Sequence, residues 1–256
     1  MTHIPSLLPW QWVLAVACTL MVGLSKTGVP GLGILFVPLF AMVLPARAST
    51  GALLPLLLVG DVIAISWYHR AAVWSHLWRL LPWAAVGIVC GFFLLGRIDD
   101  ATLRPLLGAL IIVMLGFTLW RDRPWEDPQK RTRPLPPIPT ALWFSALLGL
   151  LAGTTTMLAN AAGPVMVVYL LSMRLPKEEF LGTGAWFFGL VNAAKVPFSA
   201  GLGLITPSSL VLDGVLAGGV VAGAVLGIVA ARKLPERVFS TGILFLALGS
   251  AVLLFF

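Results

Sequence analysis

The chain has 256 residues, of which 59% are hydrophobic and 11% are charged, and its formal net charge is +7. Soluble domains usually have an apolar share of about 45 to 50%, so this composition excludes a soluble domain and indicates an integral membrane protein. The basic residues gather in short loops between apolar runs, where such residues set membrane topology. Nucleic-acid binding is therefore not expected.

Ten apolar segments follow one another along the chain. They cover residues 8–24, 29–44, 49–66, 80–96, 103–120, 140–157, 162–173, 183–199, 208–230 and 236–256. Residues 1–6 carry no Lys or Arg, so we expect no cleaved signal peptide. The pattern predicts an all-α polytopic helical bundle with five segments in each half.

One long polar stretch, residues 121–139, separates the two halves and is rich in proline and basic residues. Counting outward from it places the loops 67–79, 174–179 and 231–237 on the same side. These four loops hold twelve Lys and Arg residues, against Arg47, Arg97 and Arg104 on the other side. The positive-inside rule therefore predicts a cytoplasmic linker at 121–139 between a first repeat, 1–120, and a second repeat, 140–256.

Five segments per half predict that the second repeat is inverted in the membrane relative to the first, as in many secondary transporters. An offset of 131 residues gives a sparse internal match, in which Leu44-Pro45 corresponds to Leu175-Pro176. The same offset relates Asp61 to Asn192. Each repeat is then expected to contain a broken helix pair and three transmembrane helices.

The two breaks, at residues 25–33 and 160–164, interrupt hydrophobic segments at corresponding places in the two halves. Backbone without helical hydrogen bonds survives in a bilayer only where protein or a polar cavity satisfies it, and paired breaks mark substrate sites in transporters. Each broken pair is either a re-entrant hairpin or two short crossings. Helices starting at Pro30 and Pro164 would direct their positive N-terminal ends at an anion. The candidate substrate-binding residues at the breaks are Lys26, Thr27, Gly31, Gly33, Asn160 and Gly163.

Lys195 lies in a segment that otherwise resembles membrane core, and Asn192 precedes it by three residues on the same helical face. An intramembrane charge usually faces a pathway or a partner, so both residues are candidates for substrate binding. The alternatives are that Lys195 extends toward the interface near Ser199, and that Lys26 is a cytoplasmic loop residue.

Asp61 is the acidic residue that lies well inside an apolar segment. It is a candidate coupling residue for protons or sodium, or a counter-ion for Lys195, or an interfacial aspartate. Asp213 is expected to cap a helix or to form local hydrogen bonds. The cysteines, Cys18 and Cys90, suggest neither a redox pair nor a metal site.

Small residues recur every four positions at Gly214 and Gly218 and at Gly219, Gly223 and Gly227. Such stripes let membrane helices pack closely. They predict a helix interface and say nothing about the substrate.

The motifs around both breaks resemble those of the TauE/SafE family of sulfite exporters. The resemblance rests on Gly23-Leu-Ser-Lys-Thr-Gly-Val-Pro-Gly-Leu-Gly33, on Leu158-Ala-Asn-Ala-Ala-Gly-Pro164 and on Asn192-Ala-Ala-Lys-Val-Pro197. It implies a transporter, not an enzyme, that exports sulfite or small organosulfonates across the bacterial inner membrane. No cofactor or metal is implied.

The expected partners are a small anionic substrate and the lipid bilayer, while the coupling ion and a homodimer stay open. Two alternatives to a transporter with alternating access remain. One is a passive anion channel. The other is a membrane-embedded protease in which Asp61 and Asp213 share a proton.

Overall fold

The computed structural model describes residues 7–44, 46–95 and 142–235, together with 238, 239, 241, 242 and 245. The helices in this part of the chain are α1 (Pro9–Thr27), α2 (Gly33–Phe40), α3 (Ala46–Tyr68), α4 (Trp74–Leu94), α6 (Leu142–Ala159), α7 (Ala162–Ser172), α8 (Lys177–Gly201) and α9 (Pro207–Lys233). Each coincides with a segment predicted from the sequence. The predicted segment 103–120, the linker 121–139, most of 236–256, Arg97 and Arg104 lie outside the described residues.

Helix ends follow the local sequence. Helix α9 starts with Pro207, and its preceding Thr206 accepts a hydrogen bond from the Ser209 amide at 3.1 Å, which satisfies one of the free donors of the first turn. Arg232 and Lys233 in its last turn suit the negative end of the helix dipole. These signals determine where α9 begins and ends. Small residues dominate its packing.

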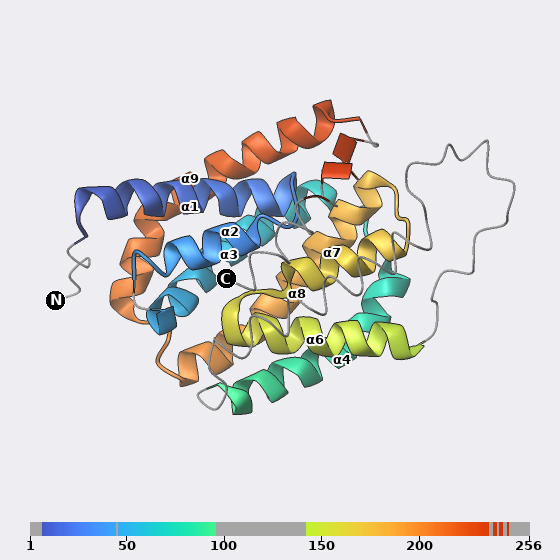
Figure 1. Ribbon diagram of the computed structural model, residues 1–256, viewed down its shortest axis with the longest axis horizontal. Coiled ribbons are helices and arrows are strands. Elements are labelled where there is room, and N and C mark those ends of the chain that lie inside the picture. Colours follow the sequence, from blue (N-terminus) through green and yellow to red (C-terminus); the bar gives the residue numbers. More distant parts are fainter. Residues whose placement is uncertain are drawn as a thin grey trace, which may run out of the picture.

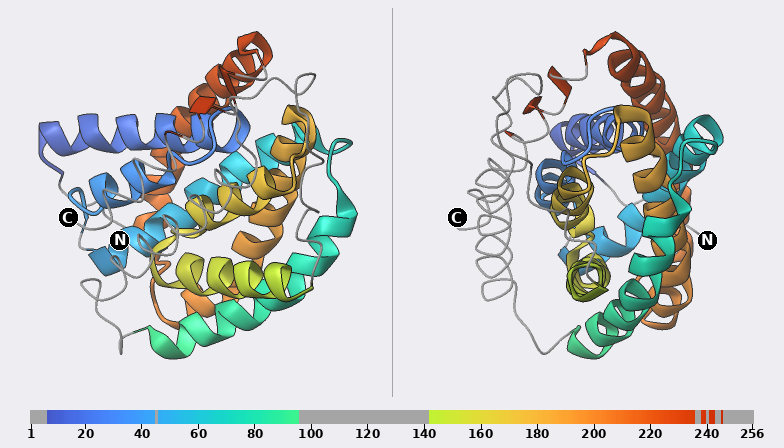
Figure 2. Two further views of the ribbon diagram at one scale, coloured as in Figure 1. Left: turned by 45° about the vertical axis from the view of Figure 1, so that its right-hand side comes forward. Right: turned by 90° about the vertical axis from the view of Figure 1, so that its right-hand side faces the viewer.

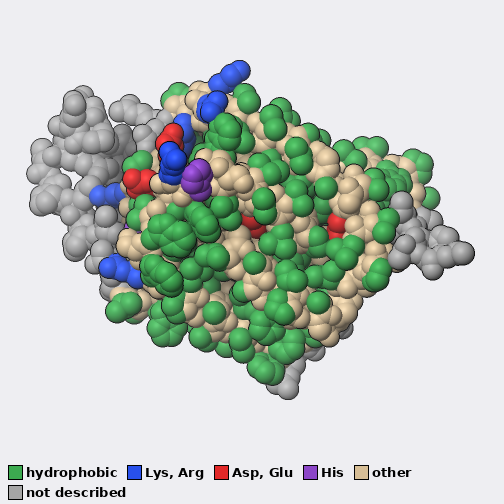
Figure 3. All heavy atoms as spheres, turned by 180° about the vertical axis from the view of Figure 1, so that it is seen from behind, with side chains coloured by type: hydrophobic (Ala, Val, Ile, Leu, Met, Phe, Trp, Pro, Cys, Tyr) green, Lys and Arg blue, Asp and Glu red, His purple; other side chains and the backbone are tan. Residues whose placement is uncertain are grey.

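The outer surface of the bundle is apolar over most of its area. Val13, Trp78 and Phe93 are 72%, 70% and 66% exposed, and Figure 3 shows hydrophobic side chains spread over one face, with the Lys, Arg and His side chains gathered toward one end. Among the described residues, four stretches are long and apolar enough to cross a membrane: Ala48–Tyr68, Trp74–Leu94, Leu142–Ala159 and Pro207–Lys233. The chain is thus an all-α, multi-pass membrane protein.

The helices that follow the two breaks are short. At a rise of about 1.5 Å per residue, the 8 residues of α2 and the 11 of α7 cannot span a hydrocarbon core of about 30 Å. Figures 1 and 2 show the chain turning back at each break. In each broken pair the second helix is therefore too short to cross the hydrocarbon core by itself.

The helices after the breaks do not begin at the prolines, contrary to the sequence prediction. Helix α2 begins at Gly33, after a turn in which Gly31 has a positive φ of 102°. Helix α7 begins at Ala162, so Pro164 occupies its first turn, where the missing amide donor breaks no helical hydrogen bond. The turn at the first break therefore continues for two residues beyond Pro30, Gly31 and Leu32.

Two closely packed helix pairs flank the centre of the bundle, with α1 along α9 and α4 along α6 (Figure 1). A Cβ at Gly223 would overlap the Leu20 carbonyl oxygen, and one at Gly153 would overlap the Ala84 carbonyl oxygen. Helices α3 and α8 pack against each other between these pairs. The close approach of the outer pairs brings the breaks next to this central crossing.

The glycine stripe of α9 is used in part. Gly219, Gly223 and Gly227 contact α1, whereas a Cβ at Gly214 or Gly218 would have no neighbour within 4 Å. Among the described residues, these last two positions therefore form no helix contact, because they do not lie on the face of α9 that meets α1. The sequence analysis also missed the equivalent interface of α4 and α6, where glycines are split between two helices.

Candidate functional site

Lys26 lies in the last turn of α1, just before the first break. Its ammonium nitrogen lies 2.7 Å from Asp61 Oδ1 of α3 and 4.5 Å from the centre of the Phe188 ring of α8. The two side chains of the ion pair are 9% and 1% exposed. Gly60 makes room for this contact, since a Cβ there would lie 2.9 Å from Lys26 Cγ.

Asp61 also joins the first half of the chain to the second. Asn192 Nδ2 of α8 donates a hydrogen bond of 2.6 Å to Asp61 Oδ2, and both residues are buried. Gly189, one turn before Asn192, lies against α3, where a Cβ would come within 2.5 Å of Ile65 Cδ1. The carboxylate is therefore held from both sides.

Lys195 lies one helical turn beyond Asn192 and is only 1% exposed. Its ammonium group donates to Asn160 Oδ1 at 2.5 Å and to Thr156 Oγ1 at 3.1 Å. It does not extend toward Ser199 and the interface, so the alternative considered for it is wrong. Asn160 sits at the second break with a positive φ of 53°, and its amide donates to the Thr50 carbonyl at 3.0 Å.

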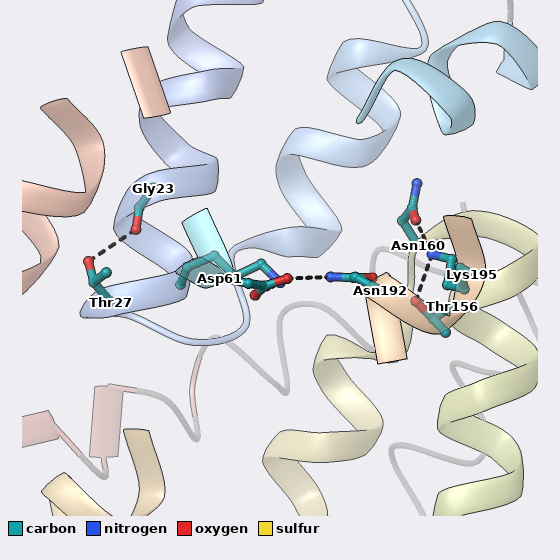
Figure 4. Close-up of polar contacts among 8 residues, drawn as sticks. Gly23, Thr27, Asp61, Thr156, Asn160, Asn192 and Lys195 are labelled. Atoms are coloured by element: carbon teal, nitrogen blue, oxygen red, sulfur yellow. Dashed lines mark hydrogen bonds and ion pairs between the residues drawn. The ribbon is translucent and has the colours of Figure 1, made fainter. Parts of the chain in front are cut away.

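These contacts place the two breaks on either side of the crossing of α3 and α8. We call Lys26, Asp61, Asn192, Lys195, Asn160 and Thr156 the central polar cluster, and Figure 4 shows Asp61 and Asn192 meeting between the two ends of it. With both lysines protonated and Asp61 ionised, its net charge is +1. A buried cationic cluster beside broken helices can bind an anion.

The remaining break residues do not join the cluster through any contact in the described structure. Thr27 donates to the carbonyl oxygens of Gly23 at 3.1 Å and Ala224 at 2.7 Å, which ties α1 to α9. Gly31 forms the turn and Gly33 starts α2. Gly163 lies beside open space, since a Cβ there would meet nothing within 4 Å.

The structure differs from two expectations for the acidic residues. Asp61 pairs with Lys26 and not with Lys195, because α3 places it against the end of α1. Asp213 neither caps a helix nor bonds locally: it lies in the second turn of α9, 5% exposed, and neither carboxylate oxygen has a hydrogen-bond partner among the residues that the structure describes. Asp61 and Asp213 therefore share no hydrogen bond.

Sequence reasoning missed two neighbours of the cluster, Phe188 under Lys26 and Tyr68 at the end of α3. The Tyr68 hydroxyl donates to the Thr27 carbonyl at 2.8 Å, so it holds the end of α1. Tyr68 could have been identified as a candidate from the sequence, since it is one of only two tyrosines in the chain and lies at the end of an apolar segment. Aromatic neighbours such as Phe188 have no such signature in a sequence with 14 phenylalanines.

The fold and the cluster define a polytopic membrane protein with a buried, cationic polar site at two broken helices. Residues 15–254 match the family described as sulfite exporter TauE/SafE, which covers nearly the whole chain. The chain belongs to the TauE/SafE family, whose members are transporters. Comparisons with curated proteins and with solved structures gave no significant match.

Proposed function

We propose that the protein is a secondary transporter that exports a small anion, sulfite or a small organosulfonate, across the bacterial inner membrane by alternating access. The central polar cluster is the substrate site. Asp61 is the candidate coupling residue, and the loops at 67–79, 174–179 and 231–237 face the cytoplasm together with the linker 121–139.

The observation that carries the proposal is the environment of Lys195. Within the described part of the chain, no carboxylate lies within ion-pair distance of its ammonium group, which bonds only to the neutral side chains of Asn160 and Thr156. A buried charge is costly unless it is paired. An anion bound here supplies the missing partner.

The charge of the cluster favours a monoanion. Lys26 and Asp61 compensate each other, which leaves the single positive charge of Lys195. Hydrogensulfite and alkylsulfonates carry one negative charge and several acceptor oxygens. Such a group can accept hydrogen bonds from Lys195 and from the amide of Asn192 once that amide leaves Asp61.

An inverted repeat is supported by the helix boundaries. Shifting α3 (Ala46–Tyr68) by 131 residues gives 177–199, close to Lys177–Gly201 for α8. The same offset relates α1 to α6 and α4 to α9. The closely packed pair α1 and α9 therefore corresponds to the other closely packed pair, α6 and α4. Asp61 and Asn192, 131 residues apart, contact each other as residues near a local two-fold axis would. Two such halves could rock around a fixed site.

The test is transport in proteoliposomes. With an imposed pH step, the wild-type protein is expected to accumulate radiolabelled sulfite or ethanesulfonate against its gradient, and Lys195→Met is expected to abolish this flux. Lys233→Met, the same exchange at an exposed position at the end of α9, serves as the matched control. Equilibration without accumulation would indicate a passive channel, and unchanged flux in Lys195→Met would remove Lys195 from the site.

A further inference from the structure

A second basic feature lies at the end of the bundle where three predicted cytoplasmic loops meet. A cavity of about 470 Å³ opens there, lined by Trp67, Tyr68, Arg70, Ala71, Lys177, Glu178, Leu181, Ala231 and Arg232. Its walls come from the end of α3, the start of α8 and the end of α9. No residue of the central polar cluster lines this cavity.

The cavity is electropositive. Among its described lining residues are three basic side chains, Arg70, Lys177 and Arg232, and one acidic side chain, Glu178, which gives these residues a net charge of +2. The Arg232 guanidinium lies 4.6 Å from the centre of the Trp67 ring, and Lys177 Nζ donates to the Ala231 and Leu234 carbonyls at 2.7 and 2.9 Å. These contacts hold two cations in fixed positions at the cavity wall.

The cavity is linked to the first break through Tyr68. This residue lines the cavity and is only 8% exposed, while its hydroxyl donates to the carbonyl of Thr27. Thr27 directly follows Lys26, whose ammonium group pairs with Asp61. Tyr68 thus connects the wall of the cavity to the residue next to Lys26.

We propose that this cavity is a vestibule that binds small oxyanions, of sulfonate or phosphate type, on their way to the central polar cluster, with Tyr68 as its floor. This inference rests on the proposed function. Clefts lined by charge of one sign raise the local concentration of the opposite ion and its rate of association. The oxyanion could be a free sulfonate or the headgroup of an anionic lipid, and the test separates these sources.

The experiment measures the charge sensed at Ala71, which lines the cavity. Ala71→Cys is made in a protein with Cys18→Ala and Cys90→Ala, and it is modified by an anionic and a cationic methanethiosulfonate reagent in vesicles of neutral lipid. Ser75→Cys, exposed at the same end outside the cavity lining, is the control. Transport of sulfonate is recorded for the same proteins.

We expect the anionic reagent to react faster than the cationic one at Ala71→Cys but not at Ser75→Cys. Adding Arg70→Gln and Arg232→Gln removes two positive charges from the lining, so the rate for the anionic reagent should fall several-fold. Free ethanesulfonate should slow the modification. Equal rates for both reagents, or no effect of the two substitutions, would overturn the vestibule.

The source of the oxyanion is decided by protection. Slower modification with free ethanesulfonate in neutral lipid supports the vestibule. Protection by phosphatidylglycerol vesicles alone overturns it in favour of a lipid headgroup. Intact sulfonate transport with no protection by ethanesulfonate contradicts this inference while leaving the proposed function standing, whereas absence of sulfonate transport contradicts the proposed function itself.

Discussion

Lys26 and Lys195 are both buried lysines beside broken helices, but their partners differ in kind. Lys26 has the carboxylate of Asp61, whereas Lys195 has two neutral oxygen atoms. A buried ion pair contributes little net stability, but leaving one of its members unpaired is costly. The two lysines should therefore respond differently to substitution of Asp61.

Asp61→Asn should destabilise the protein by about 3 to 5 kcal/mol, because it leaves the Lys26 ammonium buried without a counter-charge. The double variant Lys26→Met with Asp61→Asn should recover most of this loss, since no charge is left unpaired. Thermal unfolding in detergent measures both. If the double variant is no more stable than Asp61→Asn alone, the ion pair does not account for the effect.

Gly60→Ala probes the same ion pair without changing any charge. The added Cβ would lie 2.9 Å from Lys26 Cγ, so the lysine side chain must shift away from α3. We expect reduced transport with the protein still folded. Gly163→Ala adds the same methyl group beside the second break where it meets nothing within 4 Å, and it should be tolerated better. Equal loss of transport in both variants would contradict the prediction that Gly60→Ala acts by displacing Lys26.

Sequence reasoning identified most members of the central polar cluster but not its pairing. The offset that relates Asp61 to Asn192 was visible in the sequence, and these residues are in direct contact. Whether Asp61 pairs with Lys26 or Lys195 depends on how α3 lies against the end of α1, and spacing along the chain does not determine this. The lack of any partner for Asp213 is likewise a property of packing.

At the scale of helices, close packing through glycine holds each broken hairpin against its neighbour. Gly23 of α1 and Gly28, directly after it, face the backbone of α9, and Gly87 of α4 faces that of α6. In lipid, helix association depends on such close van der Waals contact rather than on the hydrophobic effect. The position of Lys26 at the end of α1 thus depends on small residues in another helix.

Gly223→Leu should separate α1 from α9, because its side chain would enter the space of the Leu20 backbone. We expect a protein that unfolds at a clearly lower temperature and transports poorly. Gly218→Leu lies on the same helix with nothing within 4 Å of its Cβ position, so it should behave like the wild type. Similar unfolding temperatures for both variants would contradict this packing.

At the scale of the whole molecule, the apolar segments predicted the helices well, because uninterrupted hydrophobic runs have few other structures in a membrane. The short helices α2 and α7 could not be assigned as hairpins or crossings, since hydropathy does not show where the chain turns. The basic cavity is lined by residues of three loops, and the count of basic residues predicts that these loops lie on the same side of the membrane.

The proposed orientation predicts which end of the bundle each loop faces. In a protein without its native cysteines, Gly201→Cys should react with a membrane-impermeant maleimide on intact cells, whereas Ser75→Cys should react only after permeabilisation. Both positions are exposed. The reverse labelling pattern would contradict the cytoplasmic placement of the 67–79 loop.

In the proposed transporter, the ammonium group of Lys195 binds the transported anion. Isothermal titration of the purified protein with sulfite and ethanesulfonate tests it most directly, with Lys195→Met compared against Lys233→Met. Loss of a hydrogen bond to a charged group costs about 1.5 to 3 kcal/mol. Since a change of about 1.4 kcal/mol in binding free energy changes the affinity tenfold, the affinity should fall at least tenfold. We expect this loss in Lys195→Met alone, and equal affinities in the two variants would contradict the account.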